Sequence, residues 1–218
     1  MDEKLRIIDL LSSKSVVFWD FDGVIKESID IKTDAFVELF HEYGIEILRK
    51  IKEHHLSNGG MSRFEKIPIY LKWIGVEPTE QIIKDYCQKF NSTVVLNVIN
   101  SKWVDGALDF IVSNKYNQLF YIVSATPDLE IKYIIEKLGI ADSFVKIFGA
   151  PIKKTNAIFE IIKTVGKDKS EFIMIGDALS DFEAASNNDI SFLFRKHDTN
   201  SFIFKNYIGP TISNFIGL

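Results

Sequence analysis

The chain has 218 residues, of which 46% are hydrophobic and 26% charged, and its formal net charge is −4. This composition is typical of a globular protein, and the sequence has no long basic stripe of the kind that binds nucleic acid or an anionic membrane. The single cysteine, Cys87, excludes an internal disulfide, and no apolar run reaches the ~20 residues of a membrane span. We therefore expect a cytoplasmic protein without nucleic-acid or membrane partners, either a monomer or a homodimer.

Five short apolar runs predict buried strands. In chain order they cover residues 16–20, 119–124, 144–149, 172–177 and 190–194. Between the last four runs, apolar residues recur at helical spacing, and Leu129, Ile134, Ile135 and Leu138 are predicted to share one helix face. Because strands and helices alternate, the sequence predicts an α/β fold with a parallel sheet and helices on both of its faces.

The first strand is separated from the rest of this pattern by a long helical segment. Residues 26–104 contain helical spacing, for example at Ile31, Ala35 and Phe36, and little strand signal. We therefore expect a helical domain over residues 26–104, inserted into a core domain that consists of residues 1–25 and 105–218.

Candidate site residues lie at or just after the ends of four of the predicted strands. They are Asp20, Asp22 and Gly23 at the first, Ser124 and Ala125 at the second, Lys153 and Lys154 at the third, and Asp177 and Asp181 at the fourth. Ligands of open parallel sheets bind at the carboxyl ends of the strands, so we expect these residues to surround one site. Gly23 allows a sharp turn directly after the acids.

The residue types at these strand ends indicate phosphoryl transfer. Carboxylates about 4 Å apart repel by roughly 4 kcal/mol per pair at an effective dielectric constant near 20, so a cation must offset them. Oxygen ligands without histidine or cysteine favour Mg²⁺. Ser124, a lysine and the free N–H groups of a helix start suit a phosphate. A small phosphorylated metabolite is therefore the expected partner.

These motifs together resemble a known family. DxDGV, a strand-end serine, a downstream lysine and GDxxxD occur here in the order found in the haloacid dehalogenase-like (HAD) superfamily, in its phosphoglycolate phosphatase-like and beta-phosphoglucomutase-like branch. The resemblance covers nearly the whole chain. It implies a HAD-like, Rossmann-like core domain and identifies the helical insert as the α-helical cap domain of that family.

The resemblance also implies roles for the candidate residues. Asp20 is the expected nucleophile, which forms an aspartyl-phosphate, and Asp22 is the acid that then becomes the base. Mg²⁺ is expected between the Asp20 carboxylate, the Asp22 backbone carbonyl and Asp177, with Asp181 in support. Ser124, with the adjacent Ala125, and Lys154 are expected to bind the phosphoryl group.

Several assignments have alternatives. Lys154 is preferred to Lys153 because relatives carry a lysine three positions beyond the proline. In the predicted cap, Arg63 is a candidate for binding an anionic group of the substrate, and Lys66 is a weaker one. The alternative for this segment is a helix start, with Ser62 and Glu65 as a capping box after a plain Gly59–Gly60 turn. The histidines, including His55 and His197, are expected to be solvated.

A Mg²⁺-dependent phosphatase is the favoured function, and two alternatives stay open. A sugar phosphomutase is similar through its DFDGVI stretch. A catalytically inactive phosphate-binding or signalling module is the alternative outside enzymology. Haloacid dehalogenation is disfavoured, because the dehalogenases that this chain resembles lack the second acid, which is Asp22 here.

Overall fold

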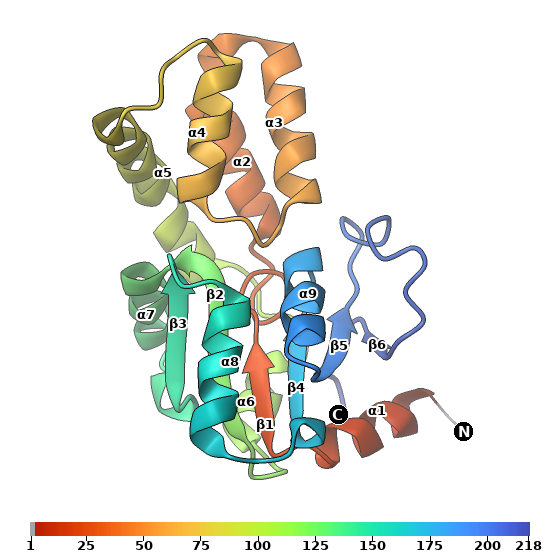
Figure 1. Ribbon diagram of the computed structural model, residues 1–218. Helices are drawn as coiled ribbons and strands as arrows, with labels where there is room; N and C mark the ends of the chain where they lie inside the picture. Colours follow the sequence, from red (N-terminus) through yellow and green to blue (C-terminus); the bar gives the residue numbers. More distant parts are fainter. Residues whose placement is uncertain (1–2) are drawn as a thin grey trace.

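The structure is a computed structural model that describes residues 3–218. Its centre is one sheet of six parallel strands in the order β3-β2-β1-β4-β5-β6 (Figure 1). The strands are β1 (Val16–Trp19), β2 (Leu119–Pro127), β3 (Lys146–Ala150), β4 (Phe172–Gly176), β5 (Ser191–Arg195) and β6 (Thr211–Ile212). The predicted α/β fold with a parallel sheet is confirmed. The two-residue β6 is too short to produce an apolar pattern and was not predicted.

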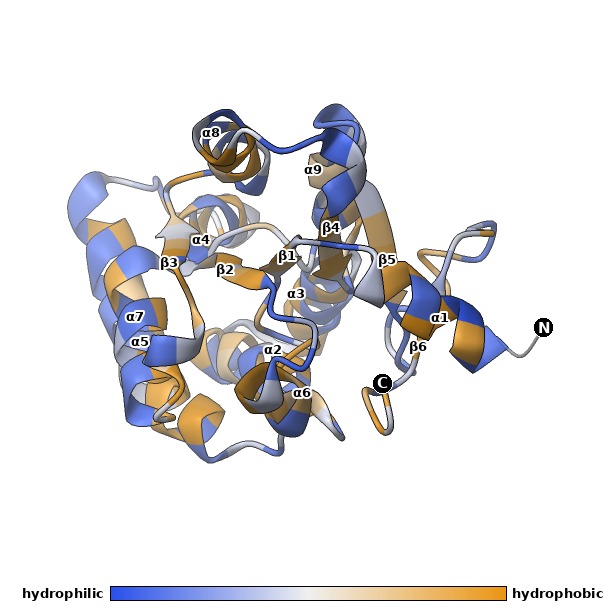
Figure 2. Cartoon of the chain, turned by 90° about the horizontal axis from the view of Figure 1, so that it is seen from below, coloured by the Kyte–Doolittle hydropathy of each residue, from blue (hydrophilic) through white to orange (hydrophobic). Residues whose placement is uncertain are grey.

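Helices cover both faces of the sheet. On one side lie α6 (Ala107–Ser113) and α7 (Asp128–Lys137), with α1 (Glu3–Ser12) towards β5; on the other lie α8 (Lys154–Val165) and α9 (Leu179–Asn187) (Figure 2). Short 3₁₀ turns occur at Ala141–Ser143 and Lys169–Glu171. Alternate strand residues enter opposite cores: Val17 and Trp19 pack towards α6 and α7, whereas Val16 and Phe18 pack towards α8 and α9.

The buried face of α7 differs from the predicted one at its first turn. Leu129 is 83% exposed, whereas Ile131, Ile134 and Ile135 are buried. At about 3.6 residues per turn, a residue five positions before Ile134 lies well round the helix from it, so Leu129 could not share that face. Glu130 is buried in its place.

Four helices stand over the carboxyl ends of the strands (Figure 1). They are α2 (Ile29–Leu39), α3 (Ile45–Ser57), α4 (Arg63–Trp73) and α5 (Glu80–Asn100), with a 3₁₀ turn at His41–Tyr43. Aromatic rings hold them together, for example Phe36, whose centroid lies 4.2 Å from that of Phe90 and 5.5 Å from that of Tyr70. Among residues 3–218, no helix combines the length and the apolar character needed to cross a bilayer.

The segment that leads into these four helices and the segment that leads out of them lie side by side. Lys26 and Trp103 form an antiparallel bridge, and the Val104 N–H donates to the Ile25 carbonyl at 3.0 Å. The predicted division into a cap (26–104) and a core (1–25 and 105–218) stays a proposal, and this paired crossing supports its boundaries. We call α2–α5 the cap helices below.

Candidate active site

The site lies where the strand order changes direction. The neighbours of β1 in the sheet are β2 and β4, so connections from its end diverge and leave a crevice. Asp20 follows β1 and Asp177 follows β4, and the Asp20 N–H donates to the Ile175 carbonyl at 3.0 Å. Parallel pairing of β1 and β4 therefore brings two acids together that are 157 positions apart in the sequence (177 − 20).

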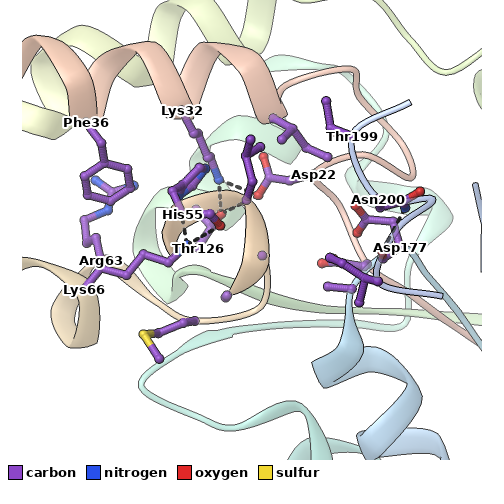
Figure 3. A pocket seen from close by; sticks show the side chains of 18 of the residues that line it. Asp22, Lys32, Phe36, His55, Arg63, Lys66, Thr126, Asp177, Thr199 and Asn200 are labelled. Carbon is purple, nitrogen blue, oxygen red and sulfur yellow. Dashed lines mark hydrogen bonds and ion pairs between the residues drawn. The ribbon is translucent and has the colours of Figure 1, made fainter. Parts of the chain in front are cut away.

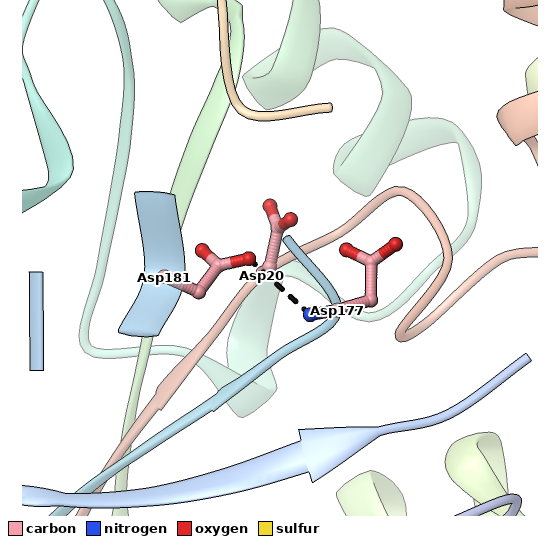
Figure 4. Close-up of side chains that lie close together, drawn as sticks. All are labelled: Asp20, Asp177 and Asp181. Carbon is pink, nitrogen blue, oxygen red and sulfur yellow. Dashed lines mark hydrogen bonds between the residues drawn. The ribbon is translucent and has the colours of Figure 1, made fainter. Parts of the chain in front are cut away.

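Three buried carboxylates gather in this crevice. One oxygen each of Asp20, Asp177 and Asp181 lies within 4.8 Å of the other two (Figure 4). The first turn of α9 positions Asp181, whose Oδ2 accepts the N–H of Asp177 at 3.2 Å and that of Ala178 at 3.0 Å. These bonds hold the loop after β4 in the shape that presents Asp177 to Asp20.

A single ammonium connects two of the acids. Lys154 Nζ lies 2.9 Å from Asp20 Oδ2 and 2.6 Å from Asp181 Oδ1, whereas the neighbouring Lys153 is exposed. Burial, together with the charge of Asp181, raises the pKa of Asp20 to about 7. Burial also raises the pKa values of Asp177 and Asp181. One lysine for three carboxylates leaves an excess of negative charge among buried groups.

This donor set fits a hard divalent cation. All three acids offer carboxylate oxygens, and an added positive charge would offset the cost that raises their pKa values. Asp20 and Asp177 could hold such a cation. Asp181 is already engaged by Lys154 and two N–H groups, which fits a supporting role.

A histidine supports Asp177 from the segment after β5. His197 Nε2 lies 2.8 Å from Asp177 Oδ2, and its Nδ1 lies 2.9 Å from the Thr199 hydroxyl. Asn200 donates to the Asp177 carbonyl at 2.9 Å. His55 and His197 were expected to be solvated, and this expectation is wrong for both, since His55 is buried and His197 contacts Asp177. His197 comes two residues after β5, so the strand-end rule that selected the acids could have found it.

Asp22 is held as a carboxylate by three donors. Ser28 Oγ donates at 2.6 Å, Thr126 Oγ1 donates at 3.1 Å, and Lys32 of α2 forms an ion pair. Burial raises the pKa of Asp22, but the charge and hydrogen bond of Lys32 and the two hydroxyls outweigh burial and lower it overall. Lys32 also donates to Thr126 at 2.8 Å, which connects a cap helix to the ends of β1 and β2.

Two smaller residues shape the crevice. Gly23 has φ of +73°, and a Cβ at this position would lie 2.6 Å from Asp177 Oδ2, so only glycine permits this turn beside the acid. Ser124 is buried near the end of β2, where its Oγ accepts the Thr126 N–H at 3.1 Å. Ala125 lines the crevice together with Asp20.

The cap helices form one side of a chamber over these groups. Its cap side is formed by Lys32 and Phe36 of α2, His55 of α3, and Arg63 and Lys66 of α4 (Figure 3). Arg63 forms an ion pair with Glu130 of α7, and Lys66 Nζ lies 2.8 Å from His55 Nδ1. The predicted capping box is present, since Glu65 accepts both the Ser62 N–H at 3.0 Å and the Ser62 hydroxyl at 2.8 Å.

The family model for haloacid dehalogenase-like hydrolases matches residues 17–194. The chain belongs to this family. This result confirms the HAD assignment made from the four motifs and their order. The match spans both the strand ends that carry the acids and the cap helices between β1 and β2.

Individual HAD-like proteins resemble the chain along most of its length. A 2-hydroxy-3-keto-5-methylthiopentenyl-1-phosphate phosphatase from Lysinibacillus sphaericus (strain C3-41) is 28% identical in an alignment 200 residues long, and this alignment covers 81% of this chain and 80% of the relative. A predicted phosphoglycolate phosphatase from Haemophilus somnus 129pt aligns with a TM-score of 0.73 at 16% identity, covering 93% of this chain and 95% of that one. A beta-phosphoglucomutase from Clostridium difficile aligns with a TM-score of 0.73 at 20% identity, covering 94% of this chain and 93% of that one.

Sequence reasoning missed the residues of this HAD-like chain that support the acids. Lys32, Thr126 and His197 contact Asp22 or Asp177 but belong to no motif. Thr126 lies at the end of β2 and His197 follows β5, whereas Lys32 lies in an ordinary helical pattern. A plain turn at Gly59–Gly60 was the alternative interpretation of this segment. A Cβ on Gly60 would lie 1.6 Å from Ser180 Oγ, so this glycine also lets the cap approach α9.

Proposed function

We propose that the protein is a Mg²⁺-dependent phosphatase that hydrolyses a small phosphorylated metabolite through an aspartyl-phosphate on Asp20. One observation carries the proposal: the Asp20 carboxylate contacts Lys154 and lies close to the acids Asp177 and Asp181, in a pocket that the cap helices help to line. A nucleophilic carboxylate, a phosphate-binding ammonium and a cation site would thereby be combined at one point.

The reaction would proceed in two displacements. In the first, Asp20 attacks phosphorus, the bond from phosphorus to the ester oxygen breaks, and that oxygen takes a proton from Asp22. In the second, a water molecule gives a proton to Asp22 and attacks phosphorus, so inorganic phosphate leaves and the Asp20 carboxylate is restored. Bound Mg²⁺ would neutralise charge on the transferring phosphoryl group. Lys154 and Ser124 would bind its oxygens.

The contacts of Asp22 suit one half of this cycle. Lys32, Ser28 and Thr126 keep the carboxyl ionised, which is the form that accepts a proton from water. To act first as an acid, Asp22 must be protonated, so we propose that it is separated from Lys32 at that stage.

The test is a panel of phosphate esters assayed for phosphate release with Mg²⁺, comparing the native protein with Asp20→Asn. The expected result is turnover of at least one ester by the native protein and none by the variant. Asp109→Asn, a change at an exposed acid on α6, is the matched control and should keep full activity. Activity retained by Asp20→Asn would refute the nucleophile.

The same experiment separates the alternatives. A sugar phosphomutase would use the same Asp20 and Lys154 but would return the phosphoryl group to the sugar, so little phosphate would appear in solution. An inactive binding or signalling module would accumulate phosphorylated Asp20 without turnover. Mass spectrometry of the intact protein, combined with the phosphate assay, distinguishes these outcomes.

A further inference from the structure

Three cationic side chains of the cap helices point into the chamber, and only two of them have a carboxylate partner. Lys32 is paired with Asp22, and Arg63 is paired with Glu130. In the part of the chain that the structure describes, no carboxylate forms an ion pair with Lys66. Lys66, which was the weaker of the two substrate-binding candidates in the sequence, is therefore the cap cation without a carboxylate partner within that part of the chain.

Lys66 is also deeply buried. The residue is only 1% exposed, and its Nζ lies 2.8 Å from His55 Nδ1. His55 is buried as well, with its ring centroid 5.0 Å from that of Phe36. Burying an ammonium without an anion is costly. Here burial, aided by the nearby charge of Lys32, lowers the pKa of Lys66 to about 7.

The position of Lys66 relates it to the reacting groups. Lys66 and His55 line the same chamber as Asp20 and Asp22. In Figure 3, Lys66 and Arg63 approach the chamber from α4, on the side away from Asp177. Apolar residues also line this chamber, among them Phe36, Met61 and Ile203. If the phosphoryl group of a molecule lies at Asp20, the rest of that molecule occupies the chamber that Lys66 also lines.

We propose that Lys66, oriented by His55, binds a second anionic oxygen group of the substrate, so that the enzyme acts on small phosphate monoesters that carry a carboxylate or another acidic group at the far end. The inference rests on the proposed phosphatase function and adds the substrate class to it. An anion beside Lys66 offsets the cost of burying its charge and forms charge-assisted hydrogen bonds. Esters of neutral alcohols lack this contact.

Matched phosphonates test the proposal without turnover. Phosphonoacetate and ethylphosphonate have the same chain length and differ in the carboxylate, and the next two longer homologues of each extend the reach of the acid. Calorimetry with Mg²⁺ should find, for at least one length, that the carboxylate-bearing member binds the native protein about tenfold or more tightly than its alkyl partner. Lys66→Met should remove this preference and leave alkylphosphonate binding within about twofold.

Further variants keep the result interpretable. Lys72→Met changes an exposed lysine on the same helix and should retain the preference. Lys66→Gln preserves a polar contact to His55 without the charge, and it should lose the preference as Lys66→Met does, which covers the case in which the methionine variant does not fold.

Two outcomes would overturn the subsite. One is equal binding of acid and alkyl phosphonates by the native protein at every length. The other is a loss of affinity in the Lys66 variants that is the same for both series. Either result leaves the phosphatase proposal intact if esters are hydrolysed. If no phosphonate binds and no ester is hydrolysed, the phosphatase proposal fails and the subsite fails with it.

Discussion

Arg63 of α4 and Glu130 of α7 form an ion pair in which the two side chains are only 5% and 6% exposed. The guanidinium also lies 4.5 Å from the ring centroid of Phe90. This pair joins a cap helix to a helix that covers the sheet. Arg63 is therefore paired with Glu130 within the protein. A substrate-binding role for Arg63 stays a prediction.

We predict that Glu130→Gln loosens the contact between the cap helices and the sheet. Breaking a buried pair leaves an uncompensated charge, which costs about 3–5 kcal/mol unless the group becomes hydrated. Movement of the cap hydrates Arg63, so amide hydrogen exchange in α4 and α5 should accelerate. Lys132→Gln, which breaks the exposed pair with Asp128 on the same helix, is the control. Equal exchange in the two variants would contradict the prediction.

Gly60 should be intolerant of a side chain because of its contact with α9. A Cβ there would lie 1.6 Å from Ser180 Oγ and 2.4 Å from Ser180 Cβ. Overpacking of this kind costs about 1–3 kcal/mol, so Gly60→Ala should lower kcat/KM by holding the cap away from the acids. The double variant Gly60→Ala/Ser180→Gly removes the clash and should recover activity. Failure of the second change to restore kcat/KM would show that the contact is not the cause.

His197 is predicted to be a positioning residue for Asp177. Residues that orient a metal ligand typically contribute 10–100-fold in metal affinity, so His197→Ala should weaken Mg²⁺ binding by about that factor. Calorimetric titration with Mg²⁺ measures this directly, without an activity assay. His41→Ala, at an exposed histidine of the cap, should not change the affinity. Unchanged Mg²⁺ affinity in His197→Ala would remove this role.

The buried Lys66 should make stability depend on pH in the alkaline range. Its pKa falls from an ordinary 10.5 to about 7 on folding because of burial and the charge of Lys32, while Asp22 and Glu65 oppose the shift. Between these values the unfolded chain binds one proton more than the folded chain, so this group raises the free energy of unfolding as pH rises, by up to about 1.4 kcal/mol per pH unit.

Comparison with Lys66→Met isolates this contribution. The free energy of unfolding of the variant minus that of the native protein should decrease as the pH rises above about 7 towards 10. His55, whose pKa is lowered well below 6.5 by burial and by Lys66, is already neutral there in both states. Urea unfolding at several pH values, in buffer without phosphate, measures the difference. A difference independent of pH would mean that Lys66 is not buried as a neutral amine.

The sequence by itself determined the sheet and the edge at which chemistry takes place. Apolar runs located β1 to β5, and parallel strands carry whatever follows them to one edge, so Asp20, Asp177 and Lys154 could be brought together without coordinates. This inference works because strand direction is a property of local chain pattern and connection length.

Only the tertiary structure decided which side chains support and surround the acids. The contacts Lys32–Asp22, His55–Lys66, Arg63–Glu130 and His197–Asp177 each join elements whose mutual rotation and docking no periodicity encodes. The rotation of α7, for instance, exposes Leu129 and buries Glu130 beneath Arg63. Burial then decides which cation keeps a partner, because the energy of a charge depends on everything packed around it and not on its neighbours along the chain.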